Sequence, residues 1–151
     1  MDLSLFDEVA DALSGLVPRD LGQLRYRARR YGIKVWFDDE APPQEHYEAQ
    51  VISRDHVAGA AVTALEVGFH SEHPQGADNV AVIARLLAAE GQWRRDVGDE
   101  AEVGVFLGRA TWRRVSETWP DPDLDSPSMA LEIAARLTDY VIAIEPVRRG
   151  A

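Results

Sequence analysis

Residues 45–73 read EHYEAQVISRDHVAGAAVTALEVGFHSEH, and this stretch decides the fold of the chain. Apolar residues alternate with polar ones in both of its halves: Tyr47, Ala49 and Val51 in the first, Leu65, Val67 and Phe69 in the second. Successive side chains of a strand point to opposite faces of a sheet, so the alternation predicts two half-buried strands. We expect these strands to pair as a hairpin.

The apolar residues of this hairpin indicate whether its register is even or odd, but not which residues pair. If both apolar sets face one core, the register must be even, because a slip of one residue would turn one set outward. An even register places His46, Glu48 and Gln50 on the same outer face as Glu66 and His70. The candidate site predicted from this pattern, with the nearby fourth histidine of the stretch, is His46, Glu48, Glu66, His70 and His73.

Three chemical interpretations of this cluster remain open. Imidazole and carboxylate groups are ligands of zinc, iron and manganese, so a divalent metal is the one cofactor that the sequence allows for. A histidine beside a glutamate can also exchange protons near neutral pH. The third interpretation, which the sequence favours, is a polar sheet face exposed to water. The spacing between His70 and His73 matches no recognised metal motif.

Composition limits the class of protein. The chain has 151 residues, 46% of them hydrophobic and 28% charged, which predicts a single folded domain over residues 1–151. It contains no cysteine, so disulfides and thiol catalysis are excluded. A net charge of −10 argues against non-specific binding to nucleic acid or to anionic membranes. The N-terminus is acidic where a signal peptide is basic, so we expect a cytoplasmic protein.

The remaining elements follow from hydrophobic periodicity and from turn residues. We expect a helix from Ser4 to Pro18, a second helix between Asp20 and Gly32, strands at 33–37, 46–53, 61–70, 103–107 and 111–118, and helices at 78–90 and 126–144. Strand 103–107 lacks alternation, which predicts a strand buried on both sides. The predicted fold is α+β, with a five-stranded, mostly antiparallel sheet, helices on one face and the order ααβββαββα.

The charged segments outside the hairpin point to a different function. Acidic residues gather in two loops, 96–102 and 121–125, and the second follows a tryptophan. We therefore expect a non-catalytic protein that binds a protein partner, or a second copy of itself, through an acidic surface. The residues of this surface are Trp119, Asp121, Asp123 and Asp125, with Arg25 and Arg29 of the second predicted helix as a complementary patch. The alternative is a small-ligand- or metal-dependent enzyme that uses the histidine and glutamate cluster.

Overall fold

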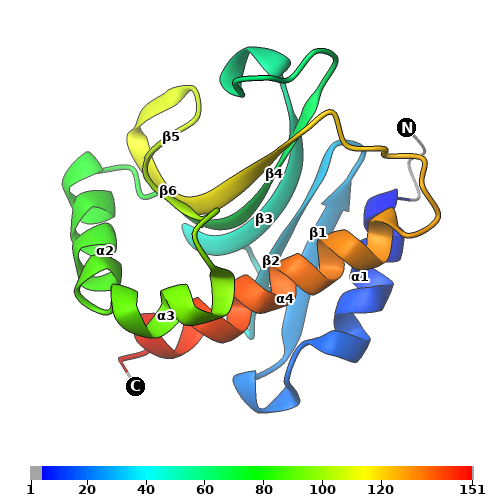
Figure 1. Cartoon of the computed structure of the whole chain (residues 1–151). Coiled ribbons are helices and arrows are strands. Elements are labelled where there is room, and N and C mark those ends of the chain that lie inside the picture. Colours follow the sequence, from blue (N-terminus) through cyan, green and yellow to red (C-terminus); the bar gives the residue numbers. More distant parts are fainter. Residues whose placement is uncertain (1–4, 151) are drawn as a thin grey trace.

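The computed structural model describes residues 5–150, which form one antiparallel sheet with α-helices packed against it (Figure 1). The sheet has six strands in the order β1-β2-β3-β4-β6-β5. The strands are β1 (Leu24–Arg29), β2 (Gly32–Phe37), β3 (Glu45–Ile52), β4 (Ala64–Ser71), β5 (Glu102–Phe106) and β6 (Arg109–Pro120). The helices are α1 (Leu5–Leu16), α2 (Gly76–Ala88), α3 (Glu90–Val97) and α4 (Met129–Arg148). The predicted α+β class is confirmed.

The central hairpin has the predicted even register. Tyr47 lies opposite Phe69, Ala49 opposite Val67, and His46 opposite His70. Tyr47, Ala49, Leu65, Val67 and Phe69 are buried in the core, and Val51 packs against it half-buried. The opposite face of the same two strands therefore carries the polar residues, as the alternation predicts.

The segment predicted as a second helix is the edge strand β1, which gives the sheet six strands rather than five. Its residues fit a helical repeat, but they also alternate, because Arg25, Arg27 and Arg29 are separated by Tyr26 and Ala28. A two-residue turn lets the segment pair with β2, and this pairing satisfies its backbone groups. The sequence pattern alone did not distinguish the helical repeat from the two-residue repeat of a strand.

Two further differences concern the C-terminal half. β5 was expected to be buried on both sides, but it is an edge strand with Glu102 and Val105 exposed. Helix α3 was not predicted; it buries Trp93 and Val97 against the core. The observed order of elements is therefore αββββααββα. The start of the first helix, expected at Ser4, lies outside the described residues.

Helix α4 lies across the inner face of the sheet and organises the core (Figure 1). It contacts β3 and β4 directly, and α1 and α3 pack against it. Its predicted apolar residues are all buried: Met129, Ile133, Ala134, Leu137, Tyr140, Val141 and Ile144. The helix continues through Pro146 to Arg148, although the proline was expected to end it. Within residues 5–150, no helix is both long enough and apolar enough to cross a bilayer.

Candidate metal centre

The outer face of β3 and β4 brings two histidines and three glutamates together. His46 and His70 form a cross-strand pair, and Gln50 lies opposite Glu66 on the same face. Glu48 lies opposite Gly68, where a Cβ atom would come within 2.6 Å of the Ser116 Cβ on β6. Because only glycine fits this close approach of β4 to β6, no side chain from β4 occupies the position beside Glu48.

Four side chains converge at the centre of this face. The Nε2 atom of His46 lies 3.1 Å from Glu48 Oε1 and 3.4 Å from Glu72 Oε2. The Nδ1 atom of His70 lies 3.2 Å from the same oxygen of Glu48 and 3.3 Å from the same oxygen of Glu72. All four of these atoms lie within 4.8 Å of one another, so the four residues could hold a metal ion.

The ring nitrogens that face away from this centre also have partners. The Nδ1 atom of His46 lies 2.8 Å from the carbonyl oxygen of Pro43, and Nε2 of His70 lies 2.6 Å from Glu66 Oε2. A carbonyl or carboxylate in this position accepts the N–H of an imidazole and leaves the opposite nitrogen with its lone pair. Glu66 is itself held by Gln50, whose amide donates to Glu66 Oε1 at 2.9 Å.

Burial and charge act against each other in this cluster. Burial alone would lower the pKa of His46, but its hydrogen bonds to Glu48 and Glu72 raise the pKa above 6.5. Burial likewise opposes the charge on His70, while Glu66 and Glu48 raise its pKa well above the ordinary value. Burial would raise the pKa of Glu48, but the two histidines lower it to about 2. Without a metal, the cluster is therefore a network of ion pairs.

The expectation of a face exposed to water is wrong. His70 is 0% exposed, Glu66 1% and His46 2%. The ring of Phe106, from β5, packs edge-on against His70 with the ring centroids 4.6 Å apart, and Trp112 packs against Phe106 in turn. The edge strand and its turn therefore cover the cluster from the β6 side. This coverage depends on residues far away in the sequence.

One predicted site residue lies elsewhere, and one site residue was missed. His73 does not join the cluster, because its Nε2 atom pairs with Glu45 Oε2 at 2.8 Å. Its place is taken by Glu72, which was not among the predicted residues. The signal for Glu72 was present, since it follows His70 by two residues and the alternation of β4 puts it on the same face.

The residues predicted to form a partner surface are dispersed. Trp119 is half-buried, and its indole N–H donates to Glu117 Oε2 at 2.8 Å. The carboxylate of Asp121 accepts hydrogen bonds from the backbone N–H groups of Ala61, Val62 and Thr63, which fixes the loop before β4. Asp123 and Asp125 are exposed.

The two arginines of the predicted complementary patch belong to the outer face of the sheet. Arg25 lies opposite Trp36, and Arg29 lies opposite Gly32. The Nε atom of Arg25 is buried and has no hydrogen-bond partner among the described residues. By the strand register, these arginines lie on the same sheet face as the histidine and glutamate cluster.

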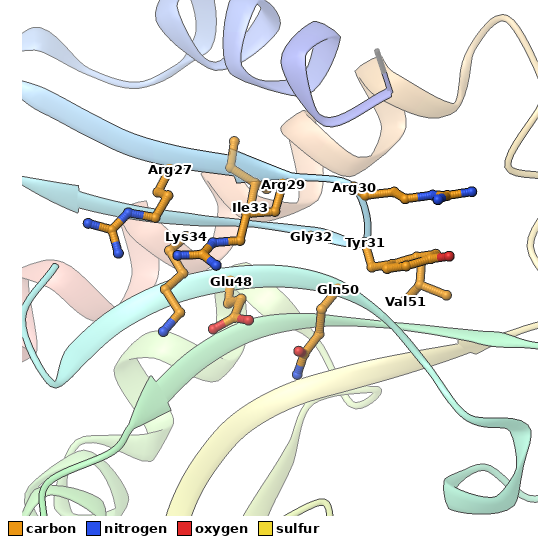
Figure 2. Close-up of a pocket in the computed structure, with 10 residues that line it drawn as sticks. All are labelled: Arg27, Arg29, Arg30, Tyr31, Gly32, Ile33, Lys34, Glu48, Gln50 and Val51. Atoms are coloured by element: carbon orange, nitrogen blue, oxygen red, sulfur yellow. The ribbon is translucent and has the colours of Figure 1, made fainter. Parts of the chain in front are cut away.

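A pocket of about 310 Å³ lies next to the cluster, over β1, β2 and β3 (Figure 2). Basic residues line it on the β1 and β2 side, and Glu48 and Gln50 line it on the β3 side. Glu48 thus belongs both to the four converging side chains and to the pocket wall. No family model, characterised protein or solved structure matches this chain significantly.

Proposed function

We propose that this protein binds a divalent transition-metal ion of the zinc class through His46, Glu48, His70 and Glu72. The observation that carries the proposal is the convergence of these four side chains, with the outward nitrogen of each imidazole held by an acceptor. Metal-binding histidines nearly always have such a partner, which fixes the ring and its tautomer.

The distances within the cluster support this proposal. A tetrahedral zinc ion holds nitrogen and oxygen ligands at about 2.0–2.1 Å, which separates neighbouring ligand atoms by roughly 3.3–3.4 Å. The four imidazole–carboxylate separations are 3.1, 3.2, 3.3 and 3.4 Å. Four of the six separations between the ligand atoms therefore have about the length that a tetrahedral ion needs, and all six are within 4.8 Å. Nitrogen and oxygen donors in this mixture suit zinc and its first-row neighbours better than magnesium or calcium.

The charges of the cluster support the same proposal. Three carboxylates, those of Glu48, Glu66 and Glu72, face two imidazoles at this site. Burying charges without partners is costly, so each carboxylate needs a cation nearby. Two protons on the imidazoles would offset two of the three negative charges in the free protein, and one divalent ion would offset the same number. Lys34 Nζ also lies 3.7 Å from Glu72 Oε1. The alternative role of the cluster is an ion-pair network that only stabilises the fold.

Metal binding is tested by removing metal with a chelator and titrating zinc by calorimetry, with the bound metal counted by mass spectrometry. We expect one ion per chain. His70→Ala should abolish binding, whereas His73→Ala is the matched control, because it removes a histidine of the same hairpin that lies outside the cluster. Since His70 is buried and its loss can unfold the chain, Glu72→Gln provides a second variant at a less buried ligand.

The outcome separates the two roles of the cluster. If the chelated protein binds no zinc, manganese, iron or cobalt, the cluster is an ion-pair network and the proposal is wrong. The proposal is equally wrong if Glu72→Gln binds zinc as tightly as the control His73→Ala. Circular dichroism of each variant shows whether a lost signal reflects lost folding.

We also propose that the acidic loop after β6 contributes to an interaction with a basic protein. The supporting observation is that Asp123 and Asp125 are exposed, whereas Asp121 and Trp119 are engaged within the chain. Exposed carboxylates on a loop attract a positively charged partner at long range. This attraction mainly raises the rate of association.

A further inference from the structure

We propose that the pocket beside the cluster binds a small organic molecule that carries an oxyanion group, a carboxylate or a phosphate. The pocket has the volume typical of small-molecule sites. Its walls bring Arg27 and Arg29 of β1 together with Lys34 of β2 on one side of the sheet (Figure 2). In a chain of net charge −10, this is a local concentration of positive charge.

The register of the strands places these cations close to one another. Arg27 lies directly opposite Lys34, and Arg29 follows two residues later on the same face. Like charges at directly opposed positions destabilise a sheet, because their side chains are neighbours. Lys34 has a partner in Glu72 Oε1 at 3.7 Å, but among the described residues neither Arg27 nor Arg29 has a carboxylate within ion-pair distance. A bound anion would relieve this repulsion.

The hollow itself depends on a glycine. Gly32 lies between Arg29 on β1 and Gln50 on β3, and it has no side chain to fill the outer face. A Cβ atom at this position would lie 2.9 Å from the carbonyl oxygen of Ala49 and 3.1 Å from the Cβ of Gln50. The pocket is thus a gap in a row of side chains, with guanidinium groups on one side and the Gln50 amide and the Glu48 carboxylate on the other.

The groups around the gap suit an oxyanion. A guanidinium donates two parallel hydrogen bonds to a carboxylate or a phosphate, and it stays charged at any pH at which the protein is folded. The side-chain amide of Gln50 and the ring of Tyr31, at the β1–β2 turn, add a polar and an aromatic surface (Figure 2). An organic anion uses both kinds of surface, whereas an inorganic ion uses only the first.

This inference goes beyond metal binding and does not require it. Of the pocket residues, only Glu48 is also a proposed metal ligand. The pocket can therefore be tested in the metal-free and the metal-loaded protein separately. If both sites are occupied, an organic anion would lie next to a metal centre on one sheet face.

The experiment is a titration followed by backbone amide resonances of the full chain, with inorganic phosphate in one arm and succinate in the other. We expect saturable shifts at the amides of Gly32, Lys34 and Gln50. In the double variant Arg27→Gln/Arg29→Gln, affinity should fall by about tenfold or more, because charge-assisted contacts are lost. Arg85→Gln/Arg95→Gln is the matched control, since it removes two exposed arginines from helices α2 and α3.

Each result decides the inference. Tighter binding of phosphate or of succinate identifies which oxyanion the pocket prefers. The absence of saturable shifts with both probes overturns the inference and leaves the metal proposal standing. Equal affinity in the Arg27→Gln/Arg29→Gln variant and in its control also overturns it. Binding that needs the metal but ignores the arginines would assign the anion to the metal and not to the pocket.

Discussion

Protonation of His46 and His70 would compete with the proposed binding of a metal ion by the same two imidazoles. Both His46 and His70 have a raised pKa in the free protein because carboxylates surround them. A metal must displace a proton from each ring that is protonated, so binding should release protons at pH values below these raised pKa values. Zinc affinity should therefore rise with pH until both imidazoles are neutral. Calorimetry in two buffers of different ionisation enthalpy measures the released protons, and binding that is independent of pH would contradict the assignment.

In the proposed metal site, Glu66 would act on the ion through His70. Its carboxylate lies 2.6 Å from His70 Nε2 and does not itself reach the four converging atoms. Glu66→Gln keeps the shape but removes the charge, and we expect zinc affinity to fall by about 10–100-fold. Cobalt substitution provides a second readout, because its visible spectrum reports how the ligands are arranged. An unchanged affinity and an unchanged cobalt spectrum would limit Glu66 to a role in stability.

Among the elements, helix α4 is the one on which the core depends most. Leu137 is 0% exposed and lies at the centre of its buried stripe. Leu137→Ala removes buried methyl groups and leaves a cavity, so the free energy of unfolding should fall by about 2–5 kcal/mol. Urea denaturation measures the loss. The exposed Leu131 of the same helix supplies the control, because Leu131→Ala should change stability little.

Elements whose apolar residues follow one clear repeat, either helical or alternating, were predictable from the sequence. Elements without such a repeat were not. The apolar residues of β3 and β4 alternate with polar ones, so an even register followed from the need to bury both apolar sets on one face. The particular pairing of His46 with His70 did not follow from the pattern. The residues of β1 fit both a helical repeat and the alternation of a strand. Only the pairing of this segment with β2 shows that it is a strand. The covering of the cluster by Phe106 was not predictable, because it depends on contacts between residues distant in sequence.

At the scale of the whole molecule, the charge distribution predicts how association responds to salt. The chain carries a net charge of −10, and Asp123 and Asp125 are exposed on one loop. If a basic protein binds there, its association rate should fall as salt rises, because ions screen long-range attraction. A pull-down at low and high salt, with light scattering of the purified chain, checks this. A monomer that retains no partner at low salt would contradict the second proposal.

The four converging side chains all come from residues 46–72, within and just beyond a single hairpin. During synthesis this segment leaves the ribosome before residues 129–148, which form α4, have been translated. Closing a loop of this length costs little chain entropy compared with assembling the whole sheet. A metal ion bound by the nascent hairpin would therefore tie its two strands together early. The supply of metal during translation would then influence the yield of folded protein.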